Sequence, residues 1–151
     1  MLPTLGLPGR SALLIATLFA FVAGCGGSRS AAPGTLAGTW VGEGKQWNDG
    51  DRSQDPDDEF EVRVSLVDSG VSGGSVEYPE LACGGTLEYA GPNTGAGAQP
   101  GDMVFQERLS YGTDNCADGG TVLLRPSGRY LIYAWSIDGY AAEAAARLSR
   151  E

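Results

Sequence analysis

Glu107 combines a titratable side chain with an unusual position in the sequence. Between Met103 and Tyr111, the residues at alternate positions are Met103, Phe105, Glu107, Leu109 and Tyr111. Successive side chains of a β-strand point to opposite faces, so a strand here places the carboxylate among large apolar side chains. A buried carboxylate is paired, hydrogen-bonded or protonated, because an isolated buried charge is costly. Glu107 and Tyr111 are therefore predicted as buried polar residues, either in a structural network with an Arg or a Tyr or in contact with a ligand.

Aromatic residues recur on the same kind of segment. Trp40 and Trp135 lie on predicted strands, as do Tyr78, Tyr89, Tyr111 and Tyr133. Large aromatic side chains either line an apolar cavity or fill the core of a small protein. Both interpretations stay open for this chain.

Several catalytic chemistries are excluded by composition. The chain contains no histidine, so Ser-His-Asp and Cys-His catalysis and a His-ligated zinc or copper site are ruled out. Acid–base catalysis by carboxylates needs a second positioned group, and no pair can be assigned from the spacing. We therefore expect a protein that is not an enzyme and that holds no metal or other cofactor.

The acidic stretch from Asn48 to Glu59 (NDGDRSQDPDDE) suggests calcium, because closely spaced carboxylates are ligands of hard cations. The spacing of an EF-hand fails, however. Counted from Asp49, the glycine position holds Gln54 and the final glutamate position holds Phe60. A solvated hairpin loop is the simpler interpretation, and its like charges would discourage aggregation of the adjoining strand edges.

The N-terminal segment has the organisation of an export signal. Residues 1–10 contain Arg10 and no acidic residue, and Ser11 to Val22 is an unbroken apolar stretch. As a helix that stretch would span about 18 Å, which is too short for a hydrocarbon core of about 30 Å. The sequence Val22-Ala23-Gly24-Cys25 then resembles the lipobox of a bacterial lipoprotein precursor. An uncleaved anchor or a buried helix is the alternative.

This resemblance implies three parts of the chain. Residues 1–24 would be a lipoprotein signal peptide, residues 25–35 a flexible tether rich in Gly, Ser, Ala and Pro, and residues 36–151 the folded domain. Cys25 would carry the lipid, which makes attachment to the membrane effectively permanent when two or more acyl chains are present. In Gram-negative sorting, an aspartate after the lipidated cysteine would favour retention in the inner membrane. Gly26 at that position is therefore compatible with the outer membrane. In a host with a single membrane, the same signal implies the outer face of the plasma membrane.

An exported location also bears on the remaining cysteines and on possible partners. With Cys25 assigned to lipid, Cys83 and Cys116 form an even pair in an oxidising compartment, which predicts a disulfide, with two free thiols as the alternative. The formal net charge of the chain is −9. Nucleic acids and anionic lipid surfaces bind clustered Lys and Arg, so we expect no nucleic-acid partner.

From Leu36 onward, short segments of period two alternate with clusters of turn residues, and Phe60 to Leu66 is the clearest of them. The last segment, residues 140–150, has local helix propensity. Its alternation of Ala142, Ala144, Ala146 and Leu148 nevertheless favours a strand. Eight consecutive strands predict an all-β, eight-stranded antiparallel up-and-down barrel. The alternatives are a β-sandwich and a barrel with a C-terminal helix.

Closure of such a barrel places the last strand beside the first. The inward alternation of the last strand then continues to Arg150, near the rim and close to Trp40. We predict that the guanidinium of Arg150 stacks on or near the indole of Trp40. Trp40 and Arg150 are therefore included, with Glu107 and Tyr111, among the candidate buried polar or ligand-contacting residues.

Three motifs in the folded part point to a type of domain. They are Gly38-Thr39-Trp40, the pattern Y-P-x-L-x-C-G-G-T-L from Tyr78 to Leu87, and F-x-E-x-L-x-Y-G-x-x-x-C-x-x-G-G from Phe105 to Gly120. Together they resemble a small extracytoplasmic module of bacterial lipoproteins and of the sensor regions of some bacterial membrane kinases. More loosely, they resemble avidin and lipocalin barrels and the periplasmic inhibitors of lysozymes and proteases.

These resemblances imply a membrane-anchored lipoprotein of the cell envelope that acts as a non-enzymatic binding or interaction module. Its ligand would be a small molecule, a glycan or a protein. The alternatives are an inhibitor of a hydrolase and a purely structural lipoprotein. An open cavity in the barrel would favour a small ligand, whereas a filled core with one projecting loop would favour the inhibitor.

Overall fold

Eight antiparallel strands form a closed barrel in which each strand pairs with its neighbours in the sequence and β8 pairs with β1. The structure is a computed structural model that describes residues 36–67 and 72–151. It confirms the predicted up-and-down barrel and rules out the sandwich. The strands are β1 (Gly38–Trp47), β2 (Asp58–Leu66), β3 (Gly74–Tyr78), β4 (Cys83–Pro92), β5 (Met103–Tyr111), β6 (Thr121–Ser127), β7 (Tyr130–Ser136) and β8 (Glu143–Arg150).

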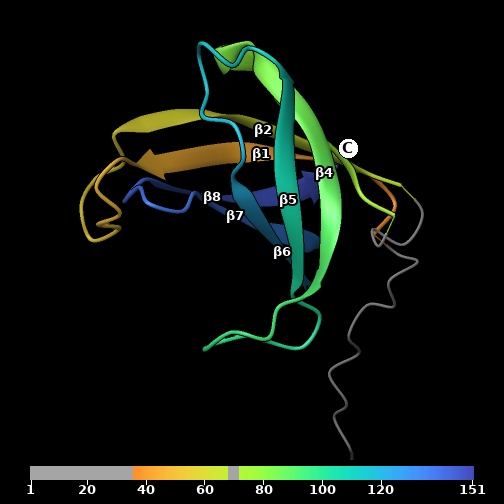
Figure 1. Ribbon diagram of the computed structural model, residues 1–151. Helices are drawn as coiled ribbons and strands as arrows, with labels where there is room; N and C mark the ends of the chain where they lie inside the picture. The colour runs from red at the N-terminus through yellow and green to blue at the C-terminus, as the bar shows by residue number, and fades with distance from the viewer. Residues whose placement is uncertain (1–35, 68–71) are drawn as a thin grey trace, which may run out of the picture.

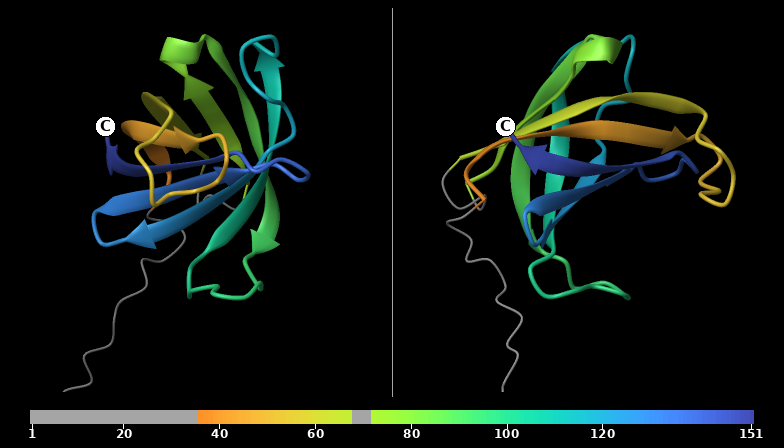
Figure 2. Two further views of the ribbon diagram at one scale, coloured as in Figure 1. Left: turned by 90° about the vertical axis from the view of Figure 1, so that its left-hand side faces the viewer. Right: turned by 180° about the vertical axis from the view of Figure 1, so that it is seen from behind.

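The barrel is flattened. In Figure 1, β1, β2, β7 and β8 run across the view, whereas β4 and β5 cross them steeply, and the views in Figure 2 agree. A short 3₁₀ turn, η2 (Pro79–Leu81), connects β3 to β4. Within the described ranges, no helix reaches the length and apolarity that crossing a membrane requires.

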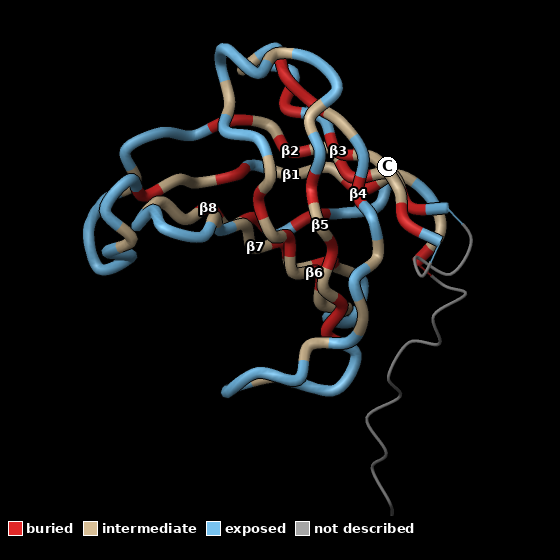
Figure 3. The backbone as a smooth tube through the Cα atoms, viewed as in Figure 1, coloured by how far each residue is buried: buried red, intermediate tan, exposed pale blue. Residues whose placement is uncertain are grey.

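Period-two alternation places the core inside the barrel, as Figure 3 shows by burial. On β2, the side chains of Phe60, Val62, Val64 and Leu66 are buried, while the residues between them are only partly covered. The same alternation holds on β8, where Ala144, Ala146 and Leu148 are buried. The predicted strand over this C-terminal segment is therefore confirmed, and the C-terminal helix is ruled out.

The two ends of the barrel differ. One end, which we call the sealed end, carries the connections β2–β3, β4–β5 and β6–β7 together with Leu36 and the C-terminus. Leu36 and the strand ends that meet there contribute buried apolar side chains, those of the strands being Trp40, Leu66, Met103, Leu124, Leu131 and Leu148. The other end, which we call the open end, carries the connections β1–β2, β3–β4, β5–β6 and β7–β8.

Trp40 and Arg150 lie together at the sealed end, as predicted. They are directly opposed in the pairing of β1 with β8. The guanidinium carbon of Arg150 is 4.9 Å from the centre of the Trp40 ring. The indole Nε1 of Trp40 donates a hydrogen bond to the carbonyl oxygen of Leu36 at 2.9 Å. These contacts fix the start of the domain against its last strand.

We expect the substitutions Arg150→Ala and Trp40→Phe to be non-additive in a double-mutant cycle. A cation held over an indole contributes about 0.5–2 kcal/mol, depending on how far it is desolvated. Either substitution removes that contact, so the second should have less left to remove. Urea unfolding of the two single variants and the double variant measures the coupling energy. Simple addition of the two effects would contradict the role of this contact in closing the barrel.

Candidate functional site

A cavity of about 270 Å³ lies at the open end of the barrel. Aromatic side chains form much of its wall, namely Phe60, Tyr78, Tyr133, Trp135 and Tyr140. Aliphatic side chains complete the apolar lining, among them Leu81, Ile137, Ala142 and Ala144. Ligand sites are typically apolar clefts of about 300–1,000 Å³ with a few placed polar groups. This cavity has the lining of such a site, and its volume, just below that range, limits it to a small ligand.

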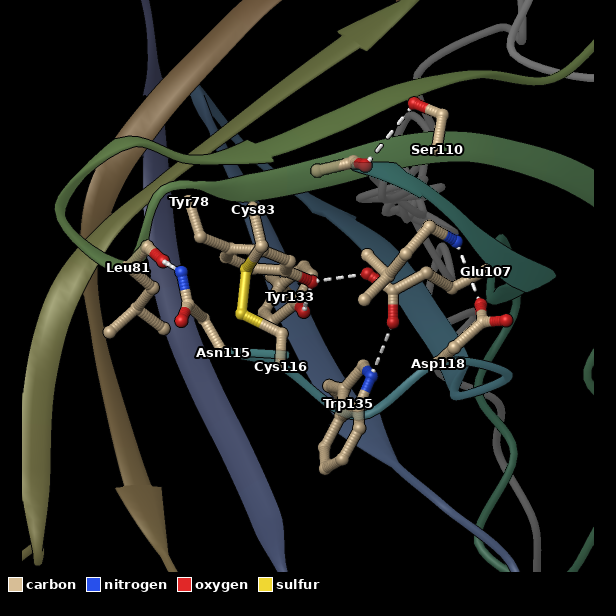
Figure 4. The surroundings of a disulfide bond; sticks show 12 residues. Tyr78, Leu81, Cys83, Glu107, Ser110, Asn115, Cys116, Asp118, Tyr133 and Trp135 are labelled. Carbon is tan, nitrogen blue, oxygen red and sulfur yellow. Dashed lines mark hydrogen bonds between the residues drawn. A yellow bond between two sulfur atoms is a disulfide. The ribbon is translucent and has the colours of Figure 1, made fainter. Parts of the chain in front are cut away.

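Glu107 lies on the wall of this cavity, where two aromatic residues donate hydrogen bonds to it and a third bonds to one of those two (Figure 4). Its Oε1 accepts a hydrogen bond from the hydroxyl of Tyr78 at 2.6 Å, and its Oε2 accepts one from Nε1 of Trp135 at 2.7 Å. The hydroxyls of Tyr78 and Tyr133 are 2.7 Å apart. Glu107 is only 1 % exposed. The predicted buried network with a tyrosine is therefore present, and it faces a cavity.

Strand geometry brings this network together from three separate strands. Glu107 comes from β5, Tyr78 ends β3, and Tyr133 and Trp135 are alternate residues of β7. Gly120, just before β6, leaves the space that Trp135 occupies, because a Cβ atom there would lie 2.0 Å from the indole Nε1. The backbone N–H of Glu107 donates to the carbonyl oxygen of Gly120 at 2.8 Å. A glycine at this position therefore lets the indole approach the carboxylate.

Burial dominates the electrostatics of the network. It raises the pKa of Glu107, while the hydrogen bonds from Tyr78 and Trp135 pull that pKa back down and the charge of Asp118 adds to the rise. Burial also holds the pKa values of Tyr78 and Tyr133 well above 10.0. Both tyrosines are therefore neutral donors at physiological pH. The hydrogen-bond partners of Glu107 are neutral side chains and not a basic residue.

A disulfide forms part of the cavity wall. Cys83 and Cys116 are bonded, which confirms the predicted pairing and excludes two free thiols. Cys83 is fully buried, whereas Cys116 is half-buried and lines the cavity. The bond ties the start of β4 to the β5–β6 loop, where Nδ2 of Asn115 also donates to the carbonyl oxygen of Leu81 at 3.0 Å. This loop is thereby fixed over one side of the open end.

Tyr111 differs from the prediction, because its side chain is 48 % exposed and lies outside the cavity. The pairing of β4 with β5 shifts register here, with Gly84 opposite Tyr111 but Gly85 opposite Leu109. Such a bulge adds a residue to one strand and breaks the period of two. A Cβ atom at Gly85 would lie 1.9 Å from the carbonyl oxygen of Arg108, so the close approach at the bulge requires glycine.

The structure also separates the remaining predicted residues. Trp40 and Arg150 border the sealed end, so they belong to the closure of the barrel and not to the cavity that contains Glu107. Cys25, the signal peptide and the tether lie outside the described residues. Sequence reasoning missed Cys116, Asn115 and Tyr140 as cavity residues, because loop positions carry no periodicity that shows which way a side chain points.

The acidic segment is a hairpin loop between β1 and β2, as predicted, with its last residues, Asp58 and Glu59, in β2, and several of its carboxylates accept hydrogen bonds from backbone N–H groups of the loop. Oδ2 of Asp57 accepts from the backbone N–H of Asn48 at 2.7 Å, and Oδ1 of Asp51 accepts from that of Ser53 at 3.0 Å. Over the described residues, no group of three or more Cys, Asp or Glu side chains is arranged to hold a metal ion.

No protein-family model, curated protein or solved structure matches this chain. The resemblances drawn from its motifs therefore stay predictions.

Replacing Glu107 with Gln is expected to flatten the decline of folding stability with rising pH. The pKa of Glu107 in the folded state is above its ordinary value of 4.5, so the folded protein binds this proton more tightly than the unfolded chain. Its contribution is then fully present below about pH 4.5 and is lost as pH rises through the folded-state pKa. The stability of the Gln variant relative to wild type should increase across that window.

Urea unfolding at a series of pH values measures this difference. The matched control is Glu88→Gln on the neighbouring strand β4, where the side chain is exposed. This control should keep the wild-type profile. A Glu107→Gln variant whose pH profile coincides with that of wild type would show that burial does not govern this carboxyl group.

Proposed function

We propose that this protein is a lipid-anchored binding module of the bacterial cell envelope, and that it holds a small ligand in the open end of its barrel. The observation that carries the proposal is the cavity of about 270 Å³ with hydrogen-bonded Glu107 on its wall. Apolar walls with a few fixed polar groups are the usual design of a ligand site. The small volume of the cavity favours a small organic molecule over an extended glycan.

The geometry supports binding better than catalysis. Both oxygens of Glu107 accept hydrogen bonds from neutral donors, which hold the carboxylate in a fixed orientation. Acid–base catalysis on a bound molecule needs a second group that can exchange a proton. Among the cavity-lining residues, all within the described part of the chain, Glu107 is the one carboxylate. Tyr78 and Tyr133 have pKa values too high to serve as bases near neutral pH.

The location rests on the leader and is supported by the disulfide. The Val22-Ala23-Gly24-Cys25 motif provides the export signal and the acceptor of the lipid. A disulfide that ties a strand to a loop of a small domain, as Cys83–Cys116 does, is typical of proteins outside the cytoplasm.

A second candidate function, inhibition of a hydrolase, is favoured by the β4–β5 loop. Residues 93–102 extend beyond the barrel in Figures 1 and 2 and are largely exposed. The carboxylate of Asp102 anchors this loop by accepting hydrogen bonds from Arg125 and from the backbone N–H of Gln99. A projecting loop that is held in place by such hydrogen bonds could insert into the active site of a partner protein.

Native mass spectrometry of the protein purified from its host tests the primary proposal. We expect the wild-type protein to retain a small molecule. The variant Ala144→Phe, which places a ring in the cavity, should lose it, and Ala145→Phe should keep it because Ala145 is only partly buried and does not line the cavity. Circular dichroism establishes that both variants fold. Wild-type protein without a retained small molecule, or equal retention of that molecule by both variants, would contradict binding in the cavity.

Replacing Cys25 with Ser is expected to block lipidation and cleavage, because a hydroxyl is not the acceptor that the lipobox chemistry uses. The variant should accumulate as the uncleaved precursor, which migrates more slowly in gel electrophoresis. Labelling cells with radioactive palmitate gives a second measurement. Incorporation of label into Cys25→Ser at the wild-type level would refute the anchor, while Ser28→Ala, three residues further on, should be labelled normally.

A further inference from the structure

We infer that the cavity selects an organic cation, namely a protonated amine carried on a small, flat, apolar body. This inference rests on the proposed binding function and specifies the class of ligand. Three features of the described residues support it: a buried carboxyl group on the cavity wall, the aromatic faces around it, and the acidic loops at the open end of the barrel.

The first feature is a buried carboxylate without a basic partner. Glu107 is 1 % exposed, and it is held by two neutral donors, the hydroxyl of Tyr78 and the indole N–H of Trp135. Each oxygen of an ionised carboxylate accepts about two hydrogen bonds. Each oxygen of Glu107 therefore has capacity for a further donor. A ligand ammonium group would supply that donor together with the positive charge that a buried carboxylate otherwise lacks.

The second feature is the aromatic lining. Phe60, Tyr78 and Tyr133 surround the cavity beside Trp135, and Phe60 meets Tyr78 edge to face with ring centres 5.8 Å apart. The faces of aromatic rings attract cations, most strongly when the cation is desolvated. Aliphatic side chains at Leu81 and Ile137 complete the walls. An amine on an apolar body can therefore place its charge near Glu107 and its carbon skeleton against these walls.

The third feature is the charge around the open end. The β1–β2 loop, residues 48–57, carries four aspartates, and the other loops at this end add Glu80, Asp114, Asp118 and Asp138. The structure describes all four of these loops, and their one basic residue is Arg52, whose Nε donates to Oε2 of Glu143 at 2.8 Å. Loops that carry an excess of one sign of charge attract counter-ions and repel ions of like charge. The open end therefore favours the entry of cations.

The sealed end has a different balance. A surface hollow at this end is bordered by Arg129 and Arg150, next to Leu36 and Trp40. The loops of the open end, which the structure describes in full, carry eight acidic residues and one basic residue, whereas Asp102 and Glu151 at the sealed end are accompanied by Arg129 and Arg150. The acidic loops and the buried carboxylate lie at the same end of the barrel, so both select the same type of ligand.

A matched series of probes tests the inference. 2-Phenylethylamine, 2-phenylethanol and 3-phenylpropionate share a phenyl ring and differ in charge, as cation, neutral molecule and anion. Binding is measured by titration calorimetry on the full lipoprotein in nanodiscs of zwitterionic lipid, with empty nanodiscs as the blank. We expect the amine to bind about tenfold or more tightly than the alcohol, as expected for a desolvated cation contact. The anion should bind most weakly.

Glu107→Gln is the decisive variant. It keeps the size of the side chain and removes its charge, so the amine and the alcohol should bind within about twofold of each other. Glu88→Gln on β4 is the control and should keep the wild-type preference. A double variant at the mouth, Asp118→Asn with Asp138→Asn, keeps the test independent of how Glu107→Gln folds. This double variant should weaken the amine and leave the alcohol unchanged, and added salt should have the same effect on wild type.

Two patterns of measurable binding would overturn the inference. One is equal affinity of wild type for the amine and the alcohol; the other is a preference for the amine that survives in Glu107→Gln. Either result leaves the binding function standing if native mass spectrometry finds a molecule that Ala144→Phe loses. If wild type binds none of the probes, the inference also fails, and the retained mass alone decides the proposed function.

Discussion

Replacement of both Cys83 and Cys116 with Ser is expected to lower the free energy of unfolding by about 3.8 kcal/mol, as estimated from loop-closure entropy. The two residues are 33 apart in the sequence, and the bond restricts the unfolded chain far more than it restricts the closed barrel. The midpoint of urea unfolding should fall accordingly. In the folded state, amide hydrogens of the β5–β6 loop, residues 112–120, should exchange faster because the loop loses its covalent tie to β4.

The matched control is the wild-type protein treated with a reducing agent, which should reproduce the midpoint of the double variant. A thiol reagent should label no cysteine of the disulfide in the denatured, unreduced protein. If the Ser variant unfolds at the wild-type urea concentration, the bond does not stabilise the fold, and the cavity wall that includes Cys116 would hold without it.

Replacement of Phe105 with Ala is expected to reduce stability by about 3–5 kcal/mol, the usual effect of removing a fully buried phenyl ring. Phe105 is inaccessible to solvent and contacts the ring of Tyr89 edge to face, with ring centres 5.5 Å apart. It is two residues before Glu107 on the same face of β5. Its loss should therefore loosen the core directly beneath the cavity. Thermal or urea unfolding measures the change.

An aromatic residue at the surface provides the comparison. Tyr140 is 74 % exposed at the mouth of the cavity, so Tyr140→Ala should change stability by no more than about 0.5 kcal/mol. Equal effects of the two substitutions would mean that the interior of the barrel is not packed as described. A small effect of Phe105→Ala alone would place the main stabilising core elsewhere.

Local pattern was sufficient to predict the architecture. Strict alternation from Phe60 to Leu66 defines a strand with one buried face, and the alternation at the C-terminus outweighed the helix propensity of its alanines. The stacking of Arg150 on Trp40 followed from barrel closure alone. The exposure of Tyr111 could not be predicted in this way, because a bulge depends on the backbone approach that Gly85 permits across the pair of strands.

The candidate site was predictable only in part. An acidic residue in an apolar stripe identified Glu107, and a tyrosine partner was among the expected alternatives. Its partners Tyr78 and Trp135 are 29 and 28 residues away in the sequence, so no local signal indicates that they donate to it. Whether aromatic residues leave a cavity depends on how far each ring reaches into the barrel. How far a ring reaches depends on three-dimensional packing and cannot be read from the order of residues.

The placement of Leu36 bears on whether the cavity takes its ligand from the bilayer or from the bulk solution. The described chain enters the barrel at the sealed end, whereas the cavity opens at the opposite end. With Cys25 anchored as proposed, the tether would attach on the side away from the cavity mouth. This orientation of the cavity favours binding of dissolved molecules from the surrounding compartment. It disfavours extraction of lipids from the membrane to which the protein is attached.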